Sequence, residues 1–102
     1  MLIPGPTTNS MSWENYMRLE TIYTWMDGLA SDFPEKCKVY NIGRSVEDRE
    51  IKLIKVGTHN RNYKRASPKP SVFIEGGLHA REWISPATVT FITKELGIFD
   101  FY

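Results

Sequence analysis

Residues 72–86 read VFIEGGLHAREWISP, and this stretch predicts a strand, a glycine turn and the start of a helix. Two glycines, Gly76 and Gly77, follow the apolar run. The turn then offers an imidazole, His79, and a carboxylate, Glu82, three residues apart. Because glycines leave room for a sharp turn, both side chains can come to the same side of the chain. The pair is a candidate for half of a metal site.

By itself, this pair is a weak signal. Zinc binds nitrogen, sulfur and oxygen donors, and catalytic sites commonly use two histidines and one carboxylate. Many helices carry a histidine and a glutamate three residues apart, however. Without further context, the simpler interpretation is a histidine at a helix start beside a capping carboxylate.

A helix is predicted directly after the pair. Ser85 is a suitable N-cap, and Pro86 is tolerated in the first turn because its missing N–H is not needed there. Gly97 breaks the pattern, and residues 98–102 form an apolar, aromatic tail. Three threonines lower the helix propensity, so packing should sustain this helix. Its apolar side consists of Ile84, Ala87, Val89, Phe91, Ile92 and Leu96.

Upstream, the sequence predicts a long amphipathic helix over about residues 13–31. Ser12 is a suitable N-cap, Phe33-Pro34 ends the pattern, and residues 1–11 should form an extended leader. The apolar positions recur mostly at steps of three and four residues. They are Trp13, Tyr16, Met17, Leu19, Ile22, Tyr23, Met26 and Leu29.

Two short β-prone runs follow, and they predict an antiparallel hairpin. The first covers residues 39–42 and the second residues 51–56, each closed by a glycine. A long, polar, basic loop is expected over residues 57–70, and a third strand over residues 71–75. Cys37 is expected to be a small buried or half-buried residue.

The predicted order is therefore helix, strand, strand, strand, helix, which is an α/β fold class. The chain has 102 residues, of which 41% are apolar and 13% aromatic, and this is enough to bury a core. A sheet of three strands with two helices would nevertheless leave apolar surface uncovered. We expect the chain to be part of something larger.

Composition excludes several function classes. Thirteen basic and twelve acidic residues give a net charge of +1, so no overall field points to nucleic acid or to a membrane surface. The basic loop residues 61–65 are interpreted as solvated charge rather than as a nucleic-acid contact. No apolar run of about 18 residues suggests a membrane span. The single cysteine excludes an intrachain disulfide.

The order of the motifs gives the decisive context. Residues 75–86, EGGLHAREWISP, resemble the first zinc-binding motif of the carboxypeptidase A/B family of zinc metallocarboxypeptidases, peptidase family M14. Residues 12–96 match that family's opening segment in order, and residues 12–102 are identified as a partial catalytic domain. The matching features upstream are Trp13, Tyr16, Ile22, Trp25, Leu29, Phe33-Pro34, Ile42-Gly43-Arg44-Ser45, Arg49-Glu50-Ile51 and Lys69-Pro70.

The resemblance implies an α/β sandwich with a mixed sheet and a secreted, extracellular enzyme that removes C-terminal residues from peptides or proteins. It implies Zn²⁺ as cofactor, His79 and Glu82 as metal ligands, and Arg81 as a substrate-binding residue. In the family, the third ligand, the carboxylate-binding arginines and the general base come downstream of this motif. We therefore expect weak zinc binding and no activity from this chain alone. His59 matches no ligand position and is interpreted as a surface histidine.

Some interpretations stay open at this stage. The chain could be a non-catalytic remnant or an interaction module with an incomplete zinc site, and its oligomeric state is unknown. Arg81 could pair with Glu75 or Glu82 instead of with substrate. The three tryptophans are interpreted as core residues. Where the family usually has glycine in its first hairpin, this chain has Asp48, which predicts an aspartate in the left-handed region.

Overall fold

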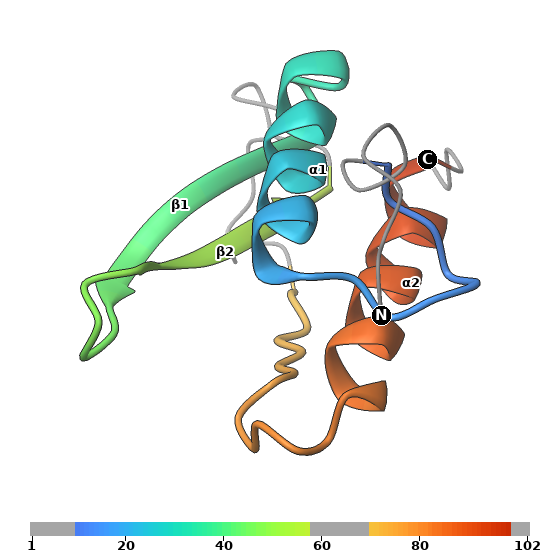
Figure 1. Ribbon diagram of the computed structural model, residues 1–102. Coiled ribbons are helices and arrows are strands. Elements are labelled where there is room, and N and C mark those ends of the chain that lie inside the picture. Colours follow the sequence, from blue (N-terminus) through green and yellow to red (C-terminus); the bar gives the residue numbers. More distant parts are fainter. Residues whose placement is uncertain (1–9, 58–69, 99–102) are drawn as a thin grey trace.

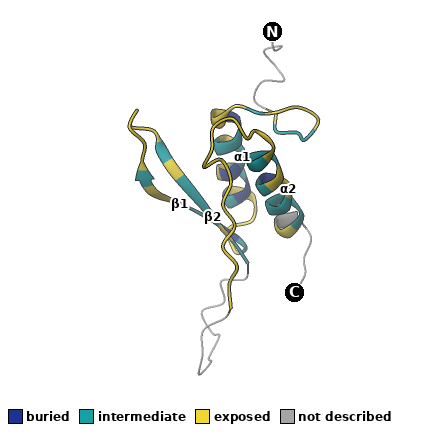
Figure 2. Ribbon diagram, turned by 90° about the horizontal axis from the view of Figure 1, so that it is seen from below, coloured by how far each residue is buried: buried dark blue, intermediate teal, exposed yellow. Residues whose placement is uncertain are grey.

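The computed structural model describes residues 10–57 and 70–98, which form two helices and one hairpin (Figure 1). The order is α1 (Leu19–Asp32), β1 (Cys37–Arg44), β2 (Glu50–Val56) and α2 (Ile84–Ile98). Figures 1 and 2 show both helices on the same side of the hairpin, where α1 contacts β1 and α2 contacts β2. The α/β class is confirmed. None of the helices in the described ranges is long and apolar enough to cross a membrane.

Helix α1 begins six residues later than predicted. Its N-cap is Arg18, which makes no side-chain capping hydrogen bond, so the expectation of Ser12 as N-cap is wrong. Trp13 and Trp25 are separated in sequence so that, within one continuous helix, they would lie about 18 Å apart. Their ring centroids are instead 5.4 Å apart, in an edge-to-face contact. The chain before Leu19 therefore folds back along the helix, and its apolar residues reach the same core from outside it.

The antiparallel hairpin is confirmed. Cys37 pairs with Val56 and Arg44 with Glu50, and the register shifts by one residue between Asn41 and Gly43. The side-chain oxygen of Asn41 accepts the Gly43 N–H at 3.0 Å, which holds this bulge.

The turn of the hairpin contains the predicted aspartate. Asp48 has φ +62°, which places it in the left-handed region, so this prediction is confirmed. Its carbonyl oxygen accepts a hydrogen bond from Arg44 Nη1 at 2.9 Å. The Ser45 hydroxyl accepts the Arg49 N–H at 3.1 Å. Aspartate tolerates this region better than most residues, and these bonds hold the turn around it.

The prediction of a third strand over residues 71–75 is wrong. Residues 70–77 have no regular secondary structure, and among the described residues β1 and β2 pair only with each other. The side chains of Val72, Phe73 and Ile74 are exposed. Residues of these types suit a sheet, but a strand also needs a neighbouring strand for its backbone hydrogen bonds. The sequence pattern therefore shows a preference for strand conformation, but it does not show whether a neighbouring strand is there to pair with.

Helix α2 forms where predicted, with different ends. It starts at Ile84, so Ser85 lies inside its first turn, and it continues through Gly97 to Ile98. The predictions for residues 1–9, for the basic loop 58–69 with His59, and for residues 99–102 fall outside the described residues.

The buried core is small. The buried apolar residues in the described ranges are Met26, Leu29 and Cys37, and most other large apolar side chains keep partial exposure (Figure 2). Cys37 is buried as predicted. Desolvation raises the pKa of its thiol, and the charge of Lys36 opposes this only in part. The thiol therefore stays protonated near neutral pH and is a poor nucleophile.

Tyr23 joins α1 to the outer edge of β2. Its hydroxyl donates to the Glu50 carbonyl oxygen at 2.8 Å and accepts the Lys52 N–H at 3.2 Å. Lys52 Nζ in turn lies 2.8 Å from an Asp27 carboxylate oxygen and 5.1 Å from the centre of the Tyr23 ring. One tyrosine thus occupies the hydrogen-bonding positions that a further strand would use here.

Replacing this hydroxyl should cost stability. In the variant Tyr23→Phe, the Lys52 N–H and the Glu50 carbonyl lose a partner, and we expect the free energy of unfolding to fall by about 1–2 kcal/mol. Urea denaturation of the purified chain measures this. Tyr40→Phe is the matched control, because Tyr40 lies exposed on β1; an equal loss in both variants would contradict the bridging role.

The Lys52–Asp27 pair should contribute stability in a defined pH range. The hydrogen bond to Asp27 raises the pKa of Lys52 above its usual 10.5, with burial opposing and the charges of Asp27 and Glu50 adding to the rise. Because the folded pKa is the higher one, the contribution is complete below pH 10.5 and is lost as pH rises through the folded value.

We expect Asp27→Asn to lower the free energy of unfolding by about 0.5 kcal/mol near pH 8, a modest value because the Asp27 side chain is largely exposed. The difference from the parent chain should shrink as pH rises beyond 10.5. Asp32→Asn, at the exposed end of the same helix, is the control and should show no such trend. A difference that stays constant across this range would contradict the assignment.

Candidate metal centre

The glycine turn before His79 is fixed by close packing on α2. A β-carbon on Gly76 would lie 2.6 Å from Val89 Cγ2 and 3.0 Å from the Ser85 carbonyl oxygen, which is too close for any side chain. Gly77 has φ +88°, a conformation that favours glycine. Its N–H donates to the Ser85 hydroxyl at 3.1 Å. Ser85, predicted as an N-cap, therefore ties the turn to the helix instead.

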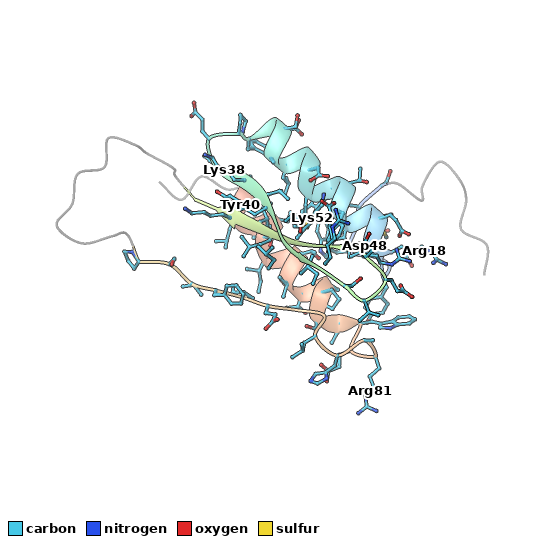
Figure 3. The ribbon with its side chains drawn as sticks, turned by 90° about the vertical axis from the view of Figure 1, so that its left-hand side faces the viewer. Arg18, Lys38, Tyr40, Asp48, Lys52 and Arg81 are labelled. Atoms are coloured by element: carbon cyan, nitrogen blue, oxygen red, sulfur yellow. The ribbon has the colours of Figure 1, made fainter. Side chains whose placement is uncertain are left out.

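Two consecutive turns, just before and at the start of α2, contain the candidate metal ligands. The Glu82 N–H donates to the His79 carbonyl oxygen at 3.0 Å, and the Ser85 N–H donates to the Glu82 carbonyl oxygen at 3.0 Å. These bonds place His79, Arg81 and Glu82 in one short loop. All three side chains are exposed, and Figure 3 shows Arg81 extending away from the body of the chain.

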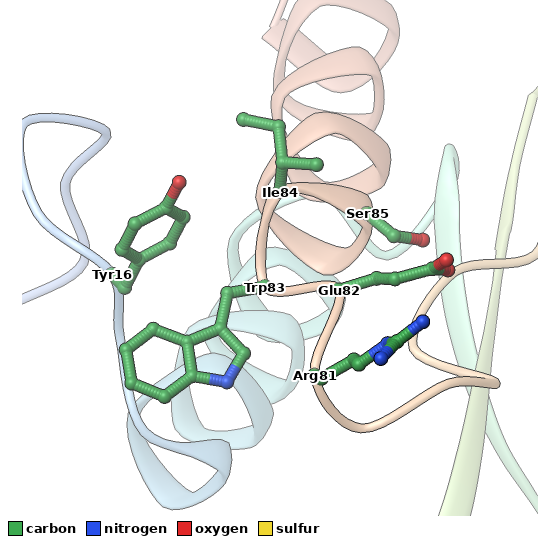
Figure 4. Close-up of a pocket in the computed structure, with 6 residues that line it drawn as sticks. All are labelled: Tyr16, Arg81, Glu82, Trp83, Ile84 and Ser85. Atoms are coloured by element: carbon green, nitrogen blue, oxygen red, sulfur yellow. The ribbon is translucent and has the colours of Figure 1, made fainter.

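The loop points its side chains in two directions. In Figure 4, Arg81 and Glu82 lie on one side of the backbone, whereas the Trp83 indole extends the other way toward Tyr16. An open surface hollow of about 500 Å³ adjoins this loop. Its lining residues are Tyr16, Arg81, Glu82, Trp83, Ile84 and Ser85.

Trp83 is not a core residue, so that interpretation is wrong for it. Its side chain is 63% exposed, and its ring centroid lies 5.7 Å from that of Tyr16 at an interplanar angle of 74°. The sequence placed Tyr16 inside a helix, where it would face the core. Only the fold-back of residues 10–18 brings it to the loop, and no periodicity signals that contact.

The donor types at the loop fit a zinc ion. His79 offers a ring nitrogen and Glu82 offers carboxylate oxygens. Within the part of the chain that the structure describes, neither side chain takes part in an ion pair or a side-chain hydrogen bond, and neither does Arg81. The described ranges also contain no group of three or more His, Cys, Asp or Glu residues that could hold a metal. The described residues thus supply two donors, and the alternative pairing of Arg81 with Glu75 or Glu82 is absent among them.

Comparison with known proteins gives these features a context. Residues 22–97 match the Peptidase M14 family, described as zinc carboxypeptidase. The chain is 46% identical over 85 residues to carboxypeptidase B of Astacus astacus, an alignment that covers 83% of this chain and 26% of the relative. It is 39% identical over 93 residues to an inactive metallocarboxypeptidase of Ajellomyces capsulatus, covering 91% of this chain and 15% of that protein.

The fold is also similar to that of a solved structure. The crystal structure of thrombin activatable fibrinolysis inhibitor matches with a TM-score of 0.73 and 30% sequence identity, over 91% of this chain and 22% of that one. The chain therefore spans about a quarter or less of the length of the proteins that it resembles.

Two glycines give opposite predictions for substitution by alanine. Gly76→Ala should lower the free energy of unfolding by about 1–3 kcal/mol, because the new methyl group collides with Val89 and with the Ser85 backbone. A β-carbon on Gly28, in α1, would meet nothing within 4 Å beyond the backbone of its own helix. Gly28→Ala should raise the free energy of unfolding by about 0.5–1 kcal/mol through helix propensity. Thermal denaturation of both variants checks the pair; a neutral Gly76→Ala would show that the turn is not tightly packed.

Proposed function

The chain belongs to the zinc carboxypeptidase family, peptidase M14, and from that premise we propose that residues 12–102 form part of a zinc-dependent metallocarboxypeptidase domain. In the complete domain, this segment serves the hydrolysis of C-terminal residues from peptides or proteins. On the family resemblance we also propose that such a protein is secreted.

We propose that His79 and Glu82 are two of the zinc ligands. The observation that carries this is the turn closed by the Glu82 N–H and the His79 carbonyl oxygen at 3.0 Å, which keeps the two donor residues together at the surface. Neither side chain has a competing partner among the described residues. A zinc ion in such a site supplies Lewis-acid polarisation of a carbonyl group and a water whose pKa is lowered to about 7.

Arg81 is proposed to contact the peptide substrate. Its guanidinium group is exposed, lies on the same side of the loop as Glu82 (Figure 4), and makes no ion pair within the described ranges. Guanidinium groups donate several hydrogen bonds in a fixed planar arrangement, which suits carbonyl and carboxylate oxygens of a peptide. Its place beside Glu82 would bring the bound chain next to the metal.

A second candidate function is a non-catalytic protein of the same fold. The similarity to a relative named inactive metallocarboxypeptidase favours considering it. The described residues also provide only two donors and no assigned general base. We therefore expect the 102-residue chain itself to release no C-terminal residues from a peptide. Zinc-dependent release that is lost in His79→Ala would contradict this expectation.

Zinc titration tests the ligand assignment. Two protein ligands leave most of the coordination to water, so we expect weak binding, seen as selective NMR shifts of the amides of residues 78–83. Both His79→Ala and Glu82→Gln should remove these shifts. His59→Ala is the matched control, because His59 is the only other histidine in the sequence, and it should bind zinc as the parent does. Loss of binding in His59→Ala with retention in His79→Ala would refute the assignment.

A further inference from the structure

The aromatic pair beside the candidate metal ligands is exposed. The rings of Tyr16 and Trp83 meet edge to face with centroids 5.7 Å apart, yet 54% of Tyr16 and 63% of Trp83 remain exposed. Little core surface is buried by this contact. Its main physical effect is to restrain the two chain segments that carry the rings.

Tyr16 sits on a segment that is itself fixed. Three residues earlier, the Trp13 ring lies 5.4 Å from that of Trp25 in α1 and 6.4 Å from that of Phe91 in α2. Its indole N–H donates to the Thr90 hydroxyl at 3.1 Å. Tyr16 is thus presented to the loop by an anchored strap, residues 10–18, and not by a free terminus.

Trp83 lies where a restraint on the backbone would affect the proposed metal ligands. It directly follows Glu82, and the two side chains leave the backbone in opposite directions (Figure 4). It also lies inside the second of the two turns that shape the loop, which is closed by the Ser85 N–H and the Glu82 carbonyl oxygen. Fixing the indole therefore fixes the rotation of the backbone that aims the Glu82 carboxylate.

We propose that Tyr16 is a positioning residue for the metal site, acting through Trp83 to hold the loop in the conformation in which His79 and Glu82 face one ion. This inference rests on the proposed zinc function. A site with two protein ligands gains affinity from preorganisation, since only the fraction of molecules with the correct loop conformation binds. A contact that served stability alone would affect the whole fold and not the loop selectively.

Tyr16→Ala, compared with the parent chain, tests this directly. We expect the Kd for Zn²⁺ to rise about threefold to tenfold, the range that corresponds to loss of one aromatic contact. We also expect faster NMR amide exchange for Glu82 and Ser85, the donors of the two loop hydrogen bonds, while the amides of the β1–β2 ladder exchange as before. Tyr16→Phe keeps the ring and should restore both values.

Tyr40→Ala is the matched control, because Tyr40 is also a partly exposed tyrosine but lies on the hairpin. It should leave zinc affinity and the exchange of Glu82 and Ser85 unchanged. The proposal is overturned if Tyr16→Ala leaves the exchange of these two amides unchanged, or accelerates the hairpin amides equally. If the parent chain binds no zinc, the proposed function fails, whereas amide exchange still decides whether Tyr16 orders the loop.

Discussion

The indole of Trp13 connects parts of the chain that no regular secondary structure links. It contacts Trp25 on α1 and Phe91 on α2, and it donates a hydrogen bond to Thr90. The ammonium group of Lys94 lies 4.8 Å from its ring centre, so a cation–π contact adds to the same cluster. Since the buried core is small, one large aromatic residue between the helices carries much of what holds them together.

Thr90 shows why a poor helix former occupies the middle of α2. Its hydroxyl is buried and lies 2.8 Å from the Pro86 carbonyl oxygen and 3.0 Å from that of Ala87, so it can donate within the helix while accepting from Trp13. Thr93 bonds the Val89 carbonyl oxygen in the same way. The loss of intrinsic propensity is offset by a tertiary hydrogen bond. Packing sustains this helix, as the sequence predicted.

Local features of the fold could be predicted from sequence, and features that depend on a distant partner could not. The hairpin and both helices follow from periodicity and turn chemistry within a few residues, and the left-handed Asp48 follows from the family resemblance. The start of α1 could not be predicted, because Trp13 keeps the helical spacing while it packs from outside the helix. The prediction of a third strand was wrong for a related reason. Residues 71–75 have side chains typical of strands, but the segment itself does not show whether another strand will pair with it.

The candidate site divides in the same way. The identity of His79, Arg81 and Glu82 as candidates came from the motif, and the need for glycine before them followed from the turn. The contact between Tyr16 and Trp83 has no sequence signature, because it arises only when the strap folds back over both helices. An exposed loop with two metal donors loses conformational entropy when it binds an ion. The packing of Gly76 on Val89 limits that loss from one side of the loop, and the aromatic contact limits it from the other. The geometry of the proposed metal ligands therefore depends on residues that are not themselves proposed as ligands, and the strap makes the order of this loop depend on the packing of the two helices.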